Sequence, residues 1–191
     1  MKFSIIANPV SGAYSVSQKK RFLCIASRTL NAKIYGLDSR CEEEFLNTAA
    51  KASSNCDCLI IAGGDGTVFQ VINAADIDNT IFSYLPLGTG NALKYALKIP
   101  GNPAVFANRI LTSTPVRLDL LRECGGKYSF FSSVGIEGEV LLLREQIASG
   151  SVSRFAAYLL AFLSALPAYR RRDYRLRLDG KDREVRSALS V

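Results

Sequence analysis

Two patterns of apolar residues alternate along the first part of the chain. Compact apolar runs predict buried β-strands at residues 3–7, 32–37, 58–62 and 81–85. Between these runs, apolar residues recur at helical spacing and predict helices at residues 15–30, 41–52, 68–75, 92–97 and 103–111. Because strands and helices alternate, we expect an α/β fold, a three-layer sandwich built on a mostly parallel sheet.

Two of the predicted helices carry clear start signals. Glu42, Glu43 and Glu44 fall in the first turn of one helix, where the helix dipole favours negative charge. Asn102 and Pro103 open another helix as its cap and its first residue.

Beyond Thr114 the alternation stops and the pattern predicts antiparallel structure. Strands are expected at residues 116–123, 127–134, 172–178 and 182–191. Helices are expected between them, at residues 139–147 and 155–169. The first two strands are expected to form a hairpin, because Gly125 and Gly126 between them make a turn.

This change divides the chain into two predicted domains. Residues 1–113 form the α/β domain, and residues 114–191 form the beginning of an antiparallel, β-rich second domain. A lone hairpin is a poor end for a sheet, so the second domain is expected to be truncated.

Two glycine-rich turns each follow an apolar run and precede a predicted helix. They read GGDGT at residues 63–67 and GTGN at residues 88–91. In open α/β sheets, ligands bind at this edge. Glycine lets the backbone approach a phosphate, and the amides at a helix N-terminus attract anions. Both turns are therefore candidate phosphate-binding loops, although neither matches the P-loop or the dinucleotide-binding fingerprint.

Asp65 is the unusual residue of the first turn, because a carboxylate among phosphate-binding amides would repel phosphate. It is expected to have a task of its own, either as a Mg²⁺ ligand or as the general base for a substrate hydroxyl. The alternative is an ordinary β-turn, in which aspartate next to glycine is common. The chain has no histidine. Nucleophile systems that depend on histidine are therefore excluded.

Composition narrows the class of protein further. Hydrophobic residues make up 48% and charged residues 21% of the 191 residues, as in globular proteins. The net charge of +7 suits an anionic partner, or it reflects a basic surface. The residues match no nucleic-acid-binding motif, so no nucleic-acid partner is expected. The five cysteines lack a zinc-site spacing and predict free thiols in a reducing, cytoplasmic compartment.

One apolar stretch bears on membrane contact. Residues 155–168 are too short to span a bilayer and contain Pro167. The large apolar side chains of this stretch are expected to pack in the protein core. The alternative is that they line a cavity for a lipid. Five arginines follow it: Arg170, Arg171, Arg172, Arg175 and Arg177. They indicate either a solvated helix end or a peripheral contact with an anionic membrane.

Three segments resemble the signatures of the diacylglycerol kinase catalytic-domain family. That family includes soluble diacylglycerol kinases, sphingosine and ceramide kinases, and related bacterial lipid kinases. The segments follow the family's order and spacing, at residues 8–12, 63–67 with Asn73, and 86–91. Residues 133–140 resemble a segment early in the family's second domain, with Glu137 at the position of an aspartate, and the similarity continues to Gly180.

The resemblance implies a lipid kinase that transfers the γ-phosphoryl group of ATP to the hydroxyl of diacylglycerol or a sphingoid base, with Mg²⁺ screening the phosphate charge. It implies that Asp65 is the catalytic carboxylate. It further implies nucleotide contacts for Asn8, Gly63, Gly64, Gly66, Thr67, Gly88, Thr89, Gly90 and Asn91. Metal ligands and oligomeric state do not follow from it.

Two departures from the family pattern leave alternatives open. Ala92 and Leu93 stand where the family often has an aspartate, as in sphingosine- and ceramide-kinase-like members. The family's later acidic, glycine-rich segment has no counterpart in these 191 residues, so catalytic competence of the chain alone does not follow. The alternatives are a non-catalytic nucleotide- or lipid-binding fragment and a related NAD or sugar-phosphate kinase.

Overall fold

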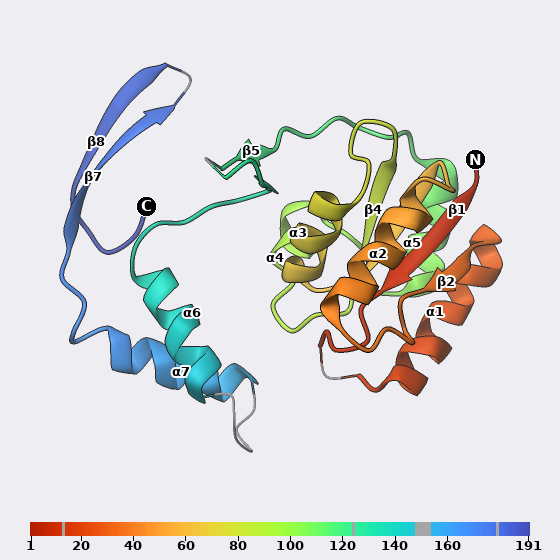
Figure 1. The fold of residues 1–191 in the computed structure, drawn as a ribbon, viewed down its shortest axis with the longest axis horizontal. Helices are drawn as coiled ribbons and strands as arrows, with labels where there is room; N and C mark the ends of the chain where they lie inside the picture. The colour runs from red at the N-terminus through yellow and green to blue at the C-terminus, as the bar shows by residue number, and fades with distance from the viewer. Residues whose placement is uncertain (13, 124, 148–153, 179) are drawn as a thin grey trace. The chain divides into compact units, whose positions relative to one another are not determined.

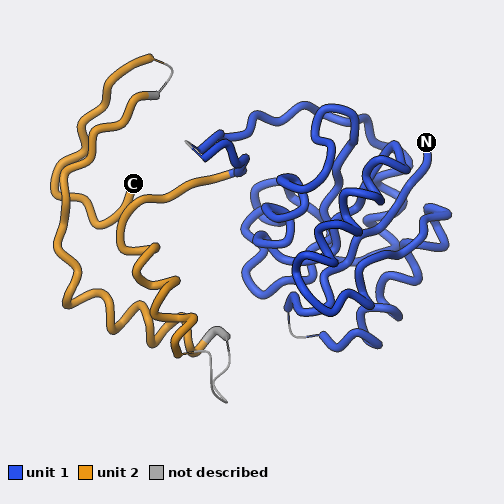
Figure 2. Tube along the Cα trace, in the orientation of Figure 1, with its two compact units in different colours: residues 1–130 blue, residues 131–191 orange. Residues whose placement is uncertain are grey.

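A four-stranded parallel sheet organises the N-terminal part of the computed structural model (Figure 1), which describes residues 1–12, 14–123, 125–147, 154–178 and 180–191. The chain divides into two compact units, residues 1–130 and residues 131–191 (Figure 2). In the first unit the strands follow the order β2-β1-β3-β4. Their bounds are β1 Phe3–Ala7, β2 Lys33–Tyr35, β3 Cys58–Gly63 and β4 Ile81–Pro86.

Parallel pairing brings three strand ends to one edge of this sheet. Ala7 of β1 lies opposite Ala62 of β3, and Gly63 lies opposite Pro86 of β4. The turns that leave these three strands therefore start side by side. Every residue of β3 is buried, as expected for a central parallel strand covered on both faces.

Helices cover both faces of the sheet. Their bounds are α1 Val16–Leu30, α2 Glu42–Ser53, α3 Asp65–Ala74, α4 Ala92–Ala96 and α5 Pro103–Thr112. One core cluster joins the sheet to α1 and α5 and includes Ile5, Leu23 and Phe106. The other joins it to α2, α3 and α4 and includes Ile6 and Phe45. Successive residues of β1 thus face opposite layers, and the predicted three-layer α/β sandwich is confirmed.

The helix starts show how local sequence fixes these elements. Asn102 caps α5, because its side-chain oxygen accepts hydrogen bonds from the amides of Ala104 and Val105 at 2.9 and 3.3 Å. This confirms the predicted cap. Helix α3 begins at Asp65, three residues before the predicted start at residue 68, because Gly64 already serves as its N-cap. The first glycine-rich turn is therefore mostly the first turn of a helix.

The predicted hairpin after Thr114 is much shorter than expected. Strands β5 (Leu121–Arg122) and β6 (Tyr128–Ser129) have two residues each, although pairing was expected over residues 116–123 and 127–134. Residues 116–119 are exposed, Val116 to 78%, and in the first segment Leu120 alone packs against the core, so little covered surface is left to extend the pairing. Asn73 of α3 holds the hairpin instead. Its side chain donates to the Tyr128 carbonyl and accepts from the Tyr128 amide, both at 2.8 Å.

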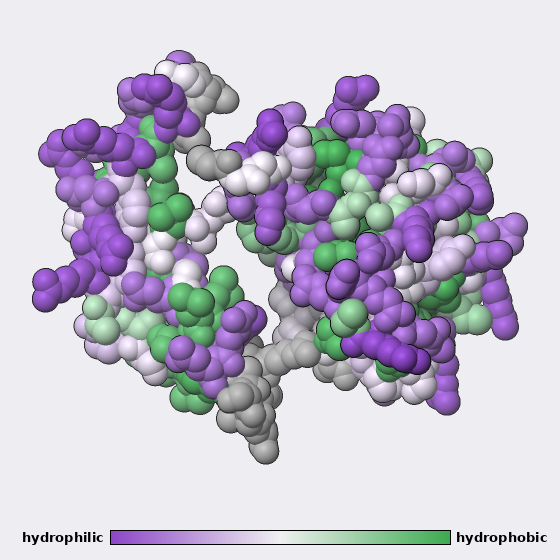
Figure 3. Space-filling model, viewed as in Figure 1, coloured by the Kyte–Doolittle hydropathy of each residue, from purple (hydrophilic) through white to green (hydrophobic). Residues whose placement is uncertain are grey.

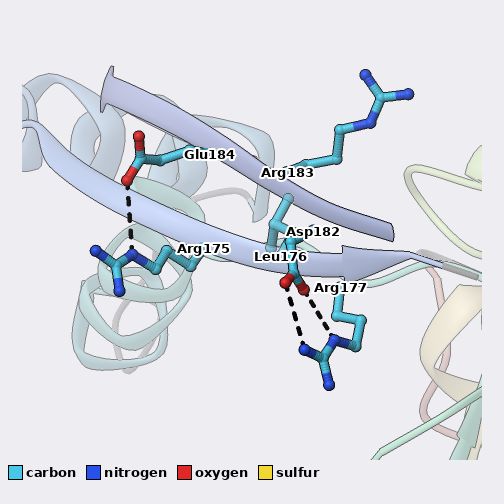
Figure 4. A pocket seen from close by; sticks show the side chains of 6 residues that line it. All are labelled: Arg175, Leu176, Arg177, Asp182, Arg183 and Glu184. Carbon is cyan, nitrogen blue, oxygen red and sulfur yellow. Dashed lines mark hydrogen bonds and ion pairs between the residues drawn. The ribbon is translucent and has the colours of Figure 1, made fainter. Parts of the chain in front are cut away.

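The second unit consists of a helix pair and a two-stranded hairpin. Its elements are α6 Ile136–Ile147, α7 Arg154–Ala165, β7 Arg172–Leu178 and β8 Lys181–Ala188. The antiparallel pairing of β7 with β8 confirms the predicted start of an antiparallel β unit. Across this hairpin, Arg175 pairs with Glu184 at 3.5 Å and Arg177 with Asp182 at 2.8 Å (Figure 4).

Helix α7 packs against Ile136 and Val140 of α6 through small residues, which corrects one expectation. The core of this helix pair contains Ala161 and Ala165 on α7, while Tyr158, Leu159 and Leu163, which were expected in the core, are between 43% and 56% exposed. Alanines allow the two helices to approach closely, so the larger side chains point outward. Figure 3 shows hydrophobic surface over this helix pair. Within the described ranges, no helix is long and apolar enough to cross a membrane.

Four of the five cysteines lie in the described ranges, and all four are free thiols: Cys24, Cys41, Cys56 and Cys58. Cys124 lies outside the described residues. Burial in β3, with smaller contributions from Cys56 and Asp57, raises the pKa of Cys58 to about 12. Its thiol therefore stays protonated at neutral pH and behaves as an apolar core group.

Candidate functional site

Three turns meet at the edge of the sheet where β1, β3 and β4 end. They comprise residues 8–12, 63–67 and 87–91, and we call them the first, second and third turn. A Cβ atom on Gly12 would collide with the carbonyl oxygen of Leu87, and one on Gly88 would collide with the Cα of Gly64. Glycine is needed at both positions, because the turns touch through their backbones.

Asp65 joins the second turn to the third. Its two carboxylate oxygens accept hydrogen bonds from the amides of Ala92 and Leu93, at 2.9 and 3.1 Å. These are the first two residues of α4, so the carboxylate of one turn caps the helix that leaves the other. Sequence reasoning expected a metal ligand, a general base or a simple turn residue here. It did not anticipate this bridging contact, which depends on how β3 and β4 pair.

The third turn is held by the side chain of Asn91. This residue has a left-handed backbone (φ 53°), which asparagine tolerates better than most residues. Its amide nitrogen donates to the Gly88 carbonyl at 2.8 Å, and its side-chain oxygen accepts from the Gly88 amide at 3.0 Å. The same oxygen accepts a bond from the Tyr84 hydroxyl at 2.8 Å.

The first turn is fixed to the second by side chains. Asn8 donates from its amide nitrogen to the Thr67 hydroxyl at 3.2 Å. Beneath the turn, Lys19 of α1 is 1% exposed, and its ammonium donates to the carbonyls of Asn8 and Pro9 at 2.9 and 2.6 Å. Sequence reasoning missed Lys19. The one signal in the sequence is its position four residues before Leu23, which places it on the apolar face of the predicted helix.

The predicted residues therefore divide into those that build the turns and those that face outward. Gly63 is buried, and its carbonyl accepts from the amides of Leu87 and Gly88. The side chain of Thr67 is also buried. By contrast, Thr89 and Gly90 are exposed.

The N-terminus of α3 also presents backbone amides that can donate hydrogen bonds. Its cap, Gly64, has no side chain that could accept hydrogen bonds from the first amides of the helix. The amides in the first turn of a helix have no acceptor within the helix, so those of Asp65 and Gly66 remain as donors. Together with the helix dipole, this arrangement can hold an anion.

A family model for the diacylglycerol kinase catalytic domain matches residues 2–122, which include all three turns. The chain belongs to the diacylglycerol kinase catalytic-domain family. A protein named diacylglycerol kinase from Staphylococcus aureus (strain MRSA252) is 29% identical over 187 residues, which cover 92% of this chain and 56% of that one. One of the same name from Bacillus subtilis (strain 168) is 30% identical over 129 residues, covering 65% and 42%.

Solved structures agree on the fold. A crystal structure of a diacylglycerol kinase from Bacillus anthracis aligns with a TM-score of 0.66 at 20% identity, over 99% of this chain and 62% of that one. A second structure from the same bacterium aligns with a TM-score of 0.70 at 19% identity, over 99% and 63%. The chain spans about half the length of the curated relatives it matches, 56% of the S. aureus protein.

A small cavity of about 100 Å³ adjoins the first turn. It lies among the first turn, the start of α2 and the side chain of Gln70 on α3, which donates to Glu42 at 2.9 Å. Its lining residues are Asn8, Pro9, Val10, Ser39, Arg40, Cys41, Glu42, Phe45 and Gln70.

The described residues contain no cluster of three or more histidine, cysteine or acidic side chains that could hold a metal ion. Within the three turns, Asp65 supplies the carboxylate that can contact a metal ion. Each of its two oxygens accepts one amide hydrogen bond and keeps a further lone pair for the ion. The turns thus fit an ion held mainly by the phosphates and water, as Mg²⁺ commonly is, and would not hold one alone.

Proposed function

We propose that the protein is an ATP-dependent lipid kinase that transfers the γ-phosphoryl group to a lipid hydroxyl, that of diacylglycerol or a sphingoid base. The observation that carries the proposal is the junction of the three turns, which leaves the amides of the α3 N-terminus beside the exposed Thr89 and Gly90. The names of the relatives support a lipid acceptor. Membership of this family also disfavours an NAD or sugar-phosphate kinase.

In this proposal the predicted site residues have two kinds of task. The amides of Asp65 and Gly66 at the start of α3, with that of Gly64 before them, bind the ATP phosphates together with the amides of Thr89 and Gly90. The remaining members shape the turns, because their polar groups are already bound within the protein: Asn8, Gly63, Thr67, Gly88 and Asn91. The cavity beside the first turn takes the nucleoside end, since its lining combines apolar side chains such as Phe45 with polar ones such as Gln70.

Asp65 is the proposed catalytic residue as well as the bridge between two turns. Its carboxylate accepts the proton of the lipid hydroxyl. The hydroxyl oxygen then bonds to the γ-phosphorus, the bond from phosphorus to the β–γ bridging oxygen breaks, and ADP leaves. Bound Mg²⁺ would neutralise charge on the phosphates. The chain's own contribution is positioning and preorganised amides, which suits a site without histidine.

The exposed apolar side chains of α6 and α7 suit a lipid acceptor. Leu142, Leu159 and Leu163 are between 47% and 64% exposed. Contiguous exposed apolar surface, such as Figure 3 shows over this helix pair, marks binding sites for proteins, membranes or apolar ligands. We propose that this helix pair binds apolar lipid chains.

The test combines turnover and binding. The purified protein is incubated with γ-labelled ATP, Mg²⁺ and vesicles containing diacylglycerol, sphingosine or monoacylglycerol, and labelled lipid is measured. Asp65→Asn is expected to lower kcat by at least about 100-fold. Asp182→Asn, on the exposed hairpin, is the control and should leave turnover unchanged.

Absence of labelled lipid with a folded protein would refute the kinase proposal. Calorimetric ATP binding without turnover would instead assign a non-catalytic nucleotide-binding role. Because Asp65 also caps α4, ATP binding by Asp65→Asn is measured in parallel. Retained binding with lost turnover supports the chemical role, whereas equal loss of both reduces Asp65 to its bridging contact.

A further inference from the structure

We infer that Tyr84 is a positioning residue of the third turn: its buried hydroxyl holds the Asn91 side chain and, through it, the conformation that presents the amides of Thr89 and Gly90. This role deepens the proposed function and rests on it, since the presented amides are those assigned to phosphate binding. Tyr84 lies near the end of β4 and was not singled out by the sequence motifs.

The hydrogen bond between Tyr84 and Asn91 has a defined donor and acceptor. The Asn91 side-chain oxygen accepts the Gly88 amide while its nitrogen donates to the Gly88 carbonyl, so the amide group cannot be flipped without breaking both bonds. The oxygen therefore faces Tyr84, whose hydroxyl must donate to it. Tyr84 is 5% exposed, and burial together with the charge of Asp65 raises its pKa, so the hydroxyl keeps the proton that it donates.

The position of this bond explains why it matters for the turn. The third turn is fixed at its start through Gly88 and at its end through Ala92, which donates to Asp65. Thr89 and Gly90 span the exposed interval between these two anchors. Asn91 sits at the second anchor in a left-handed conformation that its side-chain bonds maintain. Loss of the Tyr84 bond would let Asn91 relax and would move the two amides.

A phenylalanine substitution isolates this contact, because it removes the hydroxyl and keeps the buried ring. Tyr84→Phe is expected to lower kcat/KM for ATP by roughly tenfold, the equivalent of one well-placed hydrogen bond. KM for the lipid should stay unchanged, because the amides concern the nucleotide. Tyr35→Phe, on β2 and 36% exposed, is the matched control and should match the unmodified protein.

A double-mutant cycle tests whether Tyr84 acts through Asn91. Asn91→Ala is expected to have a lower kcat/KM for ATP than Tyr84→Phe. The double variant should have the same kcat/KM as Asn91→Ala alone. Independent, additive losses would overturn the inference, because they would mean that the hydroxyl acts elsewhere. Unchanged kcat/KM for ATP in Tyr84→Phe would overturn it as well.

Amide hydrogen exchange separates this inference from the kinase proposal. The Gly88 amide is shared between the Asn91 oxygen and the Gly63 carbonyl. Tyr84→Phe should weaken the first of these bonds and so speed exchange of the Gly88 amide, while exchange in β3 stays unchanged. This measurement needs no substrate. Faster exchange confined to the third turn supports the role of Tyr84 even if no lipid is phosphorylated, and unchanged exchange there refutes it even in an active enzyme.

Discussion

At the edge of the parallel sheet, polar side chains bind backbone groups in partly or fully buried places, whereas the ion pairs of the β7–β8 hairpin are exposed and join side chains to one another. Lys19 and Asp65 contact carbonyls and amides of the turns. Arg177 and Asp182 form an ion pair in which both side chains are more than 70% exposed. Hydrogen bonds from a side chain to the backbone hold the turns in one conformation. Exposed ion pairs between side chains contribute little to stability.

Close backbone contact should give the largest effect at the sheet edge. Gly88→Ala forces a Cβ into the Cα of Gly64, where neither atom can move without distorting a strand end. The variant is expected to lose about 3 kcal/mol of unfolding free energy and to bind ATP poorly. Chemical denaturation and calorimetry measure the two effects.

Gly138→Ala is the matched control in the second unit. Gly138 lies on α6, and a Cβ there would meet nothing within 4 Å. This substitution should stabilise the helix by up to about 1 kcal/mol. If Gly88→Ala lowered the unfolding free energy no more than Gly138→Ala, the backbones of the second and third turns would not be in contact at Gly64 and Gly88.

Two adjacent lysines give the next comparison. Lys19→Met leaves the carbonyls of Asn8 and Pro9 without their buried donor and should cost about 2 kcal/mol of unfolding free energy. Lys20 pairs with Asp38 at the surface, with side chains 55% and 89% exposed, so Lys20→Met should cost nothing measurable. Equal losses for the two variants in urea denaturation would contradict the anchoring role of Lys19.

The hairpin should show the smallest effect. Arg177→Ala removes the exposed pair with Asp182 and is expected to leave the melting temperature unchanged, and raised salt should not distinguish the variant from the unmodified protein. A clear loss of stability would show that ion pairs on this hairpin do shape the second unit. Differential scanning calorimetry at two ionic strengths decides between these outcomes.

Much of the fold could be predicted because the patterns are local. The all-apolar run in β3, the alternation of strands with amphipathic helices and the cap at Asn102 each depend on residues close together in sequence. Predictions failed where packing decides. The segment expected as a strand at residues 116–123 is covered at Leu120 alone, and the large apolar residues of α7 lie outside a core to which that helix contributes alanines.

The sequence by itself determined that two glycine-rich turns follow buried strands, since glycines, apolar runs and helix signals are readable along the chain. Only the tertiary structure decided that Asp65 caps α4, that Lys19 lies beneath the first turn, and that Tyr84 reaches Asn91. The physical reason is that these contacts join elements placed side by side by parallel strand pairing. Residue spacing along the chain carries no record of which neighbours that pairing will supply.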